Sequence, residues 1–373
     1  MGRIQYIDHL RNTANGIRLF IHAGVPYMVT VSGMWPVNEE GNWFFDFVIF
    51  EGHLFVMELF FLVAGFMFTM QYQKVGFKPL VYNRIHRIVR PFLLGMLILM
   101  PFVLMLFGLG KYTSYEWLNY PIIIQAFKDG IELGIQNFFP TGHLWFLYYL
   151  IQFYILSLIA IRFKVLRFLP PIDLYKFVAT ACFMSFVSMY FLEKWIIENP
   201  ISLLPEFTSF IHFFLFFIGG QLLYKYENQI KRLESKGMKM IGIGLVVGLI
   251  SACCQLYFEK TDHEFYYLIE FLARATYAVS SYLLAYGTWF YIKKNFTLSS
   301  PIAQYLANAS YWIYLVNLPI VMFLHLVFLP IPISIFVKFL AVLILGVLIS
   351  VGTYAIKQYF KQSGIVLNTF KSS

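Results

Sequence analysis

The chain has 373 residues, of which 60% are hydrophobic and 13% are charged, and it carries a net charge of +9. This balance excludes an ordinary soluble domain and predicts a polytopic membrane protein. The basic residues lie in short loops between apolar segments, so the positive charge indicates membrane topology and argues against a nucleic-acid partner.

Apolar segments of membrane-spanning length recur along the whole chain. By the roughly 20-residue criterion we expect about ten transmembrane helices, at approximately 15–36, 47–72, 88–108, 143–163, 174–193, 206–224, 239–258, 266–292, 303–327 and 331–357. Alternate loops are rich in lysine and arginine, which places both termini in the cytoplasm. Because no repeat of fixed period and no low-complexity linker divides the chain, residues 1–373 are expected to form one all-α domain. Its expected location is the cytoplasmic (inner) cell membrane.

The first helix carries a polar stripe. Its members follow a 3-4-3-4 spacing and therefore form one line down a single helical face: Asp8, Arg11, Asn15, Arg18 and His22. Arg11 and His22 are separated by about three turns, roughly 16 Å along the axis, so they share a face without touching. Charged side chains within a membrane are costly unless they face a protein-lined cavity, which makes this stripe the leading functional candidate.

His22 is the candidate general base, because a neutral imidazole near the cytoplasmic end of this helix can accept a proton. The alternative is a polar packing contact with a neighbouring helix. Pro26 lacks the N–H that would bond the His22 carbonyl, so the helix is expected to kink where the imidazole projects. The stripe and the proline together favour the catalytic interpretation.

Glu58 stands near the middle of the second helix, with no other charge within one turn. A carboxyl group at that depth needs a partner or a proton. Both conditions suit an active site, so Glu58 is a second catalytic candidate beside His22. A structural ion pair between Glu58 and Arg18 is the alternative.

The third span opens with three arginines followed by a proline, namely Arg84, Arg87, Arg90 and Pro91. Arg84 and Arg87 share a helical face, and Arg90 lies one step further. Guanidinium groups bind phosphate in a bidentate manner, so these arginines, together with Arg18, are candidates for holding a nucleotide-like phosphate ligand. Positive-inside anchoring is the alternative explanation for the cluster.

Several polar side chains are expected on the outer side. The fourth span begins with His143 and Trp145, and the second span carries Glu51 and His53 at a similar depth. These residues are candidates for the entrance of an outer acceptor such as a sugar. The aromatic residues are also explained by the belt that many membrane proteins place at the membrane surface.

Other polar positions have simpler interpretations. Arg274 follows Glu270 by four residues, which favours a pair within the helix. Asn317 lies near the middle of the ninth span, where a lone amide is most often a packing contact, and it is retained as a candidate substrate contact. The cysteines lie in apolar segments without metal-ligand spacing, so no metal site is expected.

The longest outer segment, 109–142, mixes isoleucines with Lys128, Asp129 and Glu132. That mixture is typical of an interfacial or re-entrant helix. A plain amphipathic connector is the alternative.

These residues carry a resemblance to a known family. Arg11 followed after ten residues by His22, Glu58 just before a double phenylalanine, and the Arg84/Arg87 pair resemble the integral membrane acyltransferase family 3. Asp8-His9-Leu10-Arg11 resembles the opening Asp-x-x-Arg of that family. The segments His143-Leu144-Trp145-Phe146-Leu147-Tyr148-Tyr149 and Tyr311-Trp312-Ile313-Tyr314 are similar to its subgroup around glucans biosynthesis protein C. The resemblance covers about residues 4–355.

The resemblance implies transfer of an acyl group, acetyl or succinyl, from cytoplasmic acyl-CoA to a hydroxyl of an extracytoplasmic or lipid-linked glycan. Acyl-CoA is then a co-substrate, and no permanently bound cofactor is expected. Carried over, Arg11 and His22 are the catalytic pair, Glu58 is their acidic neighbour, and Arg84 and Arg87 contact the coenzyme A phosphates. The lipid bilayer is the other expected partner, and an oligomer is left open.

Two departures from the family pattern affect the substrate more than the reaction. Asn317 stands where many relatives have histidine, and Ala64-Gly65-Phe66 replaces the common Ser-Gly-Phe. Both bear on the acceptor pocket or on helix packing.

The main rival function is a proton-coupled secondary transporter of a sugar or organic anion, with Glu58 and His22 as a proton relay. Such transporters often contain inverted repeats, and no second half of this chain resembles the helix that carries Arg11 and His22. A noncatalytic scaffold or sensor is a further alternative, and it predicts that Arg11, His22, Glu58 and Arg84 tolerate substitution.

Overall fold

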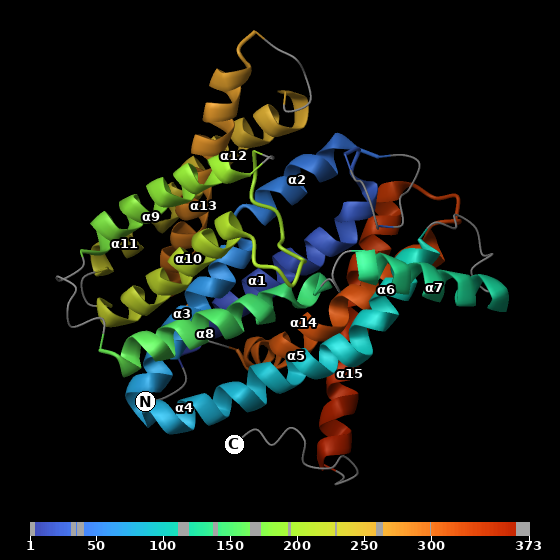
Figure 1. The fold of residues 1–373 in the computed structure, drawn as a ribbon, viewed down its shortest axis with the longest axis horizontal. Coiled ribbons are helices and arrows are strands. Elements are labelled where there is room, and N and C mark those ends of the chain that lie inside the picture. The colour runs from blue at the N-terminus through green and yellow to red at the C-terminus, as the bar shows by residue number, and fades with distance from the viewer. Residues whose placement is uncertain are drawn as a thin grey trace.

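The computed structural model is a bundle of helices (Figure 1). It describes residues 4–30, 35, 41–110, 119–136, 141–164, 173–192, 195–227, 230–258, 264–298 and 300–362. Within these ranges there is no β-strand, which confirms the all-α prediction.

The helices run in chain order from α1 to α15. Their bounds are α1 (Gln5–Gly24), α2 (Trp43–His53), α3 (Val56–Val75), α4 (Phe77–Arg84), α5 (Arg90–Leu94), α6 (Met100–Leu109), α7 (Tyr120–Gln136), α8 (Trp145–Arg162), α9 (Leu174–Ser188), α10 (Phe207–Lys225), α11 (Lys231–Glu234), α12 (Gly237–Phe258), α13 (Tyr266–Asn295), α14 (Pro301–Phe328) and α15 (Ile335–Gln362).

Eight helical segments in the described ranges are long and apolar enough to cross a membrane. Two are composite, Trp43–Val75 with α2 and α3 and Phe77–Leu109 with α4 to α6, and the other six contain α8, α9, α10, α12, α14 and α15. The prediction of a polytopic membrane protein is thus confirmed. The other two predicted spans correspond to α1 and α13, which are long helices with more polar sequences than these eight.

The first helix lies earlier in the chain than predicted. α1 begins at Gln5, well before the expected start at residue 15, and ends at Gly24. His22 therefore lies in the last turn of the helix, away from the N-terminal end, and not near the cytoplasmic end as predicted. A 3-10 turn, Val25–Tyr27, follows α1. The reason is Pro26, which cannot donate the next α-helical hydrogen bond, so the expected kink is a helix end. Residues 31–34 and 36 of the predicted span lie outside the described ranges.

The second predicted span, 47–72, consists of two helices. α2 ends at His53 and α3 begins at Val56. α3 then crosses α10 at two glycines that leave room for no side chain. A Cβ at Gly65 would collide with the Phe217 carbonyl, and one at Gly220 would collide with the Leu62 carbonyl. The segment Ala64-Gly65-Phe66, which differs from the family pattern, therefore lies where α3 crosses α10.

Two π-helical turns interrupt the segment that contains α4 to α6. Ile85–Val89 comes just before Pro91, and Gly95–Leu99 comes just before Pro101. A proline inside a helix removes a hydrogen bond and clashes with a carbonyl one turn earlier, and a wider turn relieves that clash. The side chains beyond Arg84 are consequently rotated from their positions on a regular α-helix.

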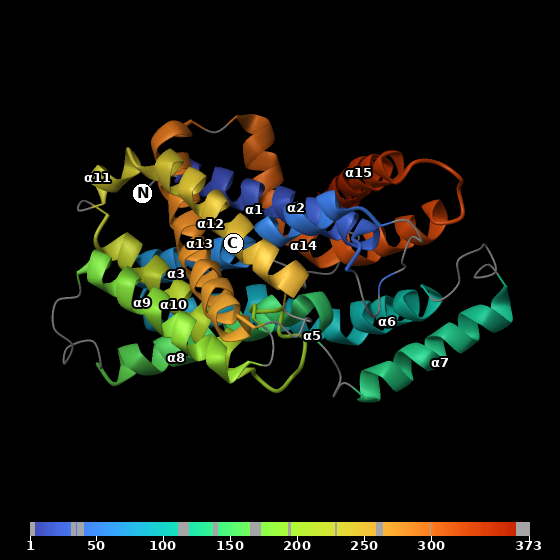
Figure 2. The same ribbon diagram turned by 90° about the horizontal axis from the view of Figure 1, so that it is seen from above.

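The outer segment 109–142 contains the helix α7, which runs beside α6 (Figure 2). Small residues bring the two helices together, because a Cβ at Gly108 would meet the Ala126 carbonyl and one at Gly130 would meet Leu104. A helix in this segment was predicted. Residues 111–118 and 137–140 of the segment lie outside the described ranges.

α1, near the N-terminus, packs against α14, near the C-terminus (Figure 1). The Asn12 Nδ2 donates to the Ala303 carbonyl over 2.8 Å. Further along α1, the rings of Phe20 and of Phe339 on α15 lie with their centroids 4.9 Å apart. The polar stripe of α1 therefore meets α14 inside the protein.

Candidate active site

The polar stripe of α1 faces the interior of the bundle. Asp8, Asn15 and Arg18 are buried, whereas Arg11 and His22 are half-buried. Within the stripe, the Asn15 Nδ2 donates to the Arg11 carbonyl over 3.0 Å, and an Arg18 terminal nitrogen donates to Asn15 Oδ1 over 3.1 Å. These local bonds fix the side chains at the spacing that the sequence indicates.

His22 is held by a hydrogen bond to α14. Its Nδ1 lies 2.8 Å from the Oδ1 of Asn317, a buried residue. With the amide oxygen as acceptor, Nδ1 carries the proton and Nε2 keeps its lone pair. Nε2 has no hydrogen bond within the described part of the chain, and the ring of Trp35 lies beside the imidazole with centroids 6.1 Å apart. The geometry leaves His22 Nε2 available as a base.

The histidine of α14, His325, contacts the backbone of His22. The Nε2 of His325 lies 3.4 Å from the His22 carbonyl, which Pro26 leaves without its helical partner. The hydroxyl of Tyr27 lies 3.4 Å from Nδ1 of the same His325. Tyr27 and His325 are both buried, so this chain of contacts closes the end of α1. Sequence reasoning predicted the free carbonyl but missed its partner.

Arg18 lies one turn from His22 and is fully enclosed, with 4% of its surface exposed. It donates to the Tyr314 carbonyl over 3.2 Å, and its guanidinium carbon lies 4.5 Å from the centre of the Tyr314 ring. The alternative ion pair with Glu58 is not formed. Arg18 therefore contacts α14 and the stripe.

The start of α8 joins the same group through His143. The His143 Nε2 lies 3.0 Å from the Leu315 carbonyl, and the Tyr314 hydroxyl donates to the His143 carbonyl. The Tyr314 ring, on which Arg18 lies, also lies beside the His143 ring, with centroids 6.0 Å apart. The structure thus brings together four of the predicted site residues, His22, Arg18, His143 and Asn317, whereas the side chain of His53 is exposed.

The two remaining outer candidates lie elsewhere. Trp145 is buried in the aromatic core, where its ring contacts those of Phe61 and Phe213, with centroids 6.1 and 5.0 Å away. Glu51 points toward α12, because its carboxylate oxygens would lie 2.7 Å from a Cβ at Gly248.

Glu58 pairs with a residue that sequence reasoning missed. Its Oε1 lies 3.0 Å from the Nε2 of His212 on α10, and the two side chains are 1% and 0% exposed. Tyr277 and Tyr282 place their rings 6.3 and 6.2 Å from the His212 ring. The only sequence signal for this partner was a lone histidine in an otherwise apolar span. The predicted pair of Glu270 and Arg274 does form, at 2.8 Å.

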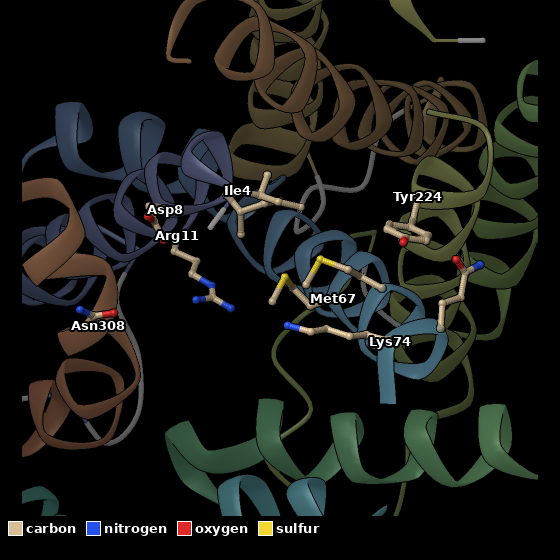
Figure 3. A pocket seen from close by; sticks show the side chains of 10 residues that line it. Ile4, Asp8, Arg11, Met67, Lys74, Tyr224 and Asn308 are labelled. Atoms are coloured by element: carbon tan, nitrogen blue, oxygen red, sulfur yellow. The ribbon is translucent and has the colours of Figure 1, made fainter. Parts of the chain in front are cut away.

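At the opposite end of α1 from His22, a cavity of about 580 Å³ lies among α1, α3, α10 and α14 (Figure 3). Arg11 and Lys74 extend their charged groups into it from two sides. Met67 and Met70 give it an apolar wall, and Asn308 adds an amide. This combination of cations and apolar surface can hold a ligand that has both phosphates and an uncharged arm.

The three arginines of the third span differ in their surroundings. Arg84 is half-buried, donates to Gln71 and lies with its guanidinium carbon 4.9 Å from the centre of the Tyr154 ring. Arg84 does not line the cavity of Arg11, but its partner Gln71 follows the cavity residue Met70 on α3. Arg87 and Arg90 are exposed. The π-helical turn Ile85–Val89 explains why the single face predicted for Arg84 and Arg87 is not formed.

No group of three metal-ligating side chains occurs in the described ranges. A comparison with protein families matches residues 4–355 to the model described as an acyltransferase domain. No curated protein and no solved structure matches the chain.

Proposed function

The chain belongs to this acyltransferase family and is a membrane acyltransferase, and from that premise we propose that it moves an acetyl or succinyl group from cytoplasmic acyl-CoA to a glycan hydroxyl. The acceptor is an extracytoplasmic or lipid-linked saccharide, and the membrane is the cytoplasmic membrane. The likeness to glucans biosynthesis protein C belongs to the same proposal.

The observation that carries this proposal is the placement of two groups on α1. Arg11 faces the cavity near the basic loops, and His22 presents an unbonded Nε2 about three turns away, roughly 16 Å along the axis. A donor with its phosphates beside Arg11, Lys74 and Arg84 would extend its thioester along α1 toward His22. Positive-inside topology places the Arg11 end in the cytoplasm.

In the proposed reaction, His22 Nε2 takes the proton from the acceptor hydroxyl as that oxygen attacks the thioester carbonyl. The carbon–oxygen bond of the ester forms, the carbon–sulfur bond breaks, and the proton passes to the departing thiolate. Asn317 holds the imidazole in the required tautomer through the 2.8 Å bond to Nδ1. A transient acyl-histidine is the alternative route, in which Nε2 attacks the thioester first.

Glu58 has a different proposed role. Its partner His212 is buried with it between α3 and α10, and neither group contacts the stripe of α1. We therefore assign the pair to the stability of the bundle and assign the chemistry to His22.

Donor binding is tested by thermal unfolding of the purified protein with acetyl-CoA or succinyl-CoA, because a ligand that binds only the folded state raises its stability. We expect stabilisation in wild type and its loss in Lys74→Ala/Arg84→Ala. Arg90→Ala is the matched control, since Arg90 is exposed on the same segment, and it should keep the stabilisation. No stabilisation of folded wild type by either thioester would contradict the proposal, and thioester-independent uptake of sugars into proteoliposomes would favour a transporter.

A further inference from the structure

Within the described ranges, Arg18 is a buried cation without a carboxylate partner. Its polar contacts are the Tyr314 carbonyl at 3.2 Å and the Asn15 amide oxygen at 3.1 Å, and its Nε is buried without a hydrogen bond. The face of the Tyr314 ring is the remaining contact. A guanidinium group has five N–H donors, and these bonds use two of them. Three donors therefore remain for a ligand.

Two other enclosed cations in the described ranges have anionic partners, and a third, Lys338, donates to the Leu329 carbonyl. Arg274 has Glu270 at 2.8 Å, and Lys293 has Glu227 and Glu234 at 3.0 and 3.3 Å. A buried charge without a counter-ion is strongly unfavourable, most of all within a membrane. The contrast indicates that the counter-charge of Arg18 comes from a bound substrate.

The position of Arg18 limits which part of a substrate can supply that charge. It lies one helical turn from His22, and the Tyr314 ring that it contacts lies beside the His143 ring, with centroids 6.0 Å apart. Arg11 and the cavity lie about two turns away in the other direction, roughly 10 Å along α1. A coenzyme held by its phosphates at Arg11 therefore places its reacting acyl group, and not its phosphates, beside Arg18.

We propose that Arg18 binds the terminal carboxylate of a dicarboxylic acyl group, so that the donor is a monothioester of succinyl length. This inference rests on the proposed function. In a succinyl group the reacting carbonyl carbon and the carboxylate carbon are joined by three carbon–carbon bonds, a span of about 4 Å. Side chains at positions i and i+4 of a helix lie on one face, so Arg18 and His22 can contact the two ends of one short ligand.

The transfer leaves the bound carboxylate unchanged. The carbon–sulfur bond breaks and the ester carbon–oxygen bond forms at the other end of the acyl group, and the hydroxyl proton passes through His22 to the thiolate. The carboxylate stays ionised against Arg18 throughout. Its product is an ester that carries a negative charge, whereas an acetyl donor would leave a neutral ester and an unpaired Arg18.

The test compares the dissociation constants of three thioesters for the full chain in lipid nanodiscs. These are succinyl-CoA, acetyl-CoA and the coenzyme A thioester of succinic monoamide, which keeps the shape and loses the charge. We expect wild type to bind succinyl-CoA about tenfold or more tightly than either neutral thioester, as a charged hydrogen-bonded contact requires. Arg18→Gln should reduce this ratio to about one, and Arg18→Lys should retain part of it.

Each result decides the inference separately from the proposed function. Equal binding of the three thioesters to wild type overturns the Arg18 inference and leaves the acyltransferase proposal standing. Failure of folded wild type to bind any thioester contradicts the proposed function itself. If Arg18→Gln does not fold, the wild-type comparison of succinyl and monoamide thioesters still decides.

A second arm distinguishes the other source of a carboxylate, an acidic sugar acceptor. Glucuronic acid and glucose are added in place of the thioesters. One outcome is that glucuronic acid binds more tightly than glucose, that Arg18→Gln loses this difference, and that the thioesters bind alike. This outcome overturns the donor assignment and shows that Arg18 binds the acceptor. No difference between the sugars, together with discrimination among the thioesters, supports the donor assignment.

Discussion

Two polar centres lie inside this bundle, and they differ in how completely they are satisfied. Glu58 and His212 form a closed pair, with 1% and 0% of their side chains exposed and 3.0 Å between the bonded atoms. His22 is half-buried, bonded at Nδ1 only, and has the uncompensated Arg18 as its neighbour on α1. The polar groups of Glu58 and His212 bond each other, whereas His22 and Arg18 keep polar groups available for a ligand.

The comparison shows why an isolated charge in a membrane helix is ambiguous evidence of function. Both Glu58 and His22 stand in apolar surroundings in the sequence, and both satisfy the expectation that intramembrane ionisable residues are functional. The partner decides between the two interpretations, and here it lies on a helix far away in the chain. A closed pair contributes to stability, whereas an open group contributes to chemistry.

The largest expected effect follows replacement of His22. His22→Gln keeps a polar side chain of similar size and removes the proton acceptor, so we expect acyl transfer to fall by about 10²–10⁴-fold. The measurement is thiol release from the donor by the purified protein with its acceptor. His9→Gln is the matched control, because His9 lies near the start of α1, where it contacts the Leu298 carbonyl and the Phe296 ring in the described part of the chain. Normal activity of folded His22→Gln would contradict both catalytic routes.

The next effect is on stability and sharpens the contrast directly. Glu58→Ala leaves His212 buried without its partner, so we expect a loss of about 3 kcal/mol in the free energy of unfolding, with activity per folded molecule near that of wild type. Glu58→Leu/His212→Leu should recover much of the lost stability, because it removes both polar groups. Thermal unfolding and a double-mutant cycle provide the measurement. A folded Glu58→Gln protein without activity would show that Glu58 takes part in catalysis.

The smallest effect concerns the end of α1. His325→Leu removes the donor to the His22 carbonyl, and we expect a few-fold loss in kcat with little change in KM, since one net hydrogen bond is worth about 1 kcal/mol. Pro26→Ala restores a backbone N–H at the position that would bond this carbonyl. The loss caused by His325→Leu should therefore shrink in the Pro26→Ala background. An equal loss in both backgrounds would mean that His325 acts in another way.

Local patterns predicted much of the fold and part of the site. Hydropathy indicated the membrane helices, the 3-4-3-4 spacing indicated the stripe, and the four-residue separation indicated the pair of Glu270 and Arg274. Each of these signals depends on residues within one helix. The start of α1 was not predicted because its polar residues lower the local hydropathy. Only packing against the neighbouring helices keeps these residues away from lipid.

Contacts between distant helices were beyond these patterns. His212 and His325 meet Glu58 and His22 across 154 and 303 residues of sequence, and no local spacing encodes such pairs. Asn317 was interpreted first as a packing contact, and it bonds the imidazole of His22. The prediction for the arginine cluster assumed a regular α-helix, whereas a π-helical turn begins between Arg84 and Arg87.

The bonds from α1 to α14 also bear on how the protein is made. Asn12, Arg18 and His22 have partners 291 to 296 residues later in the chain. At a synthesis rate of about 5–20 residues per second, roughly 15–60 seconds separate the emergence of α1 from that of α14. During that interval the polar face of α1 must remain at the membrane surface or in the insertion machinery. A chain truncated before α14 would leave this helix without its partner and would be a substrate for membrane quality control.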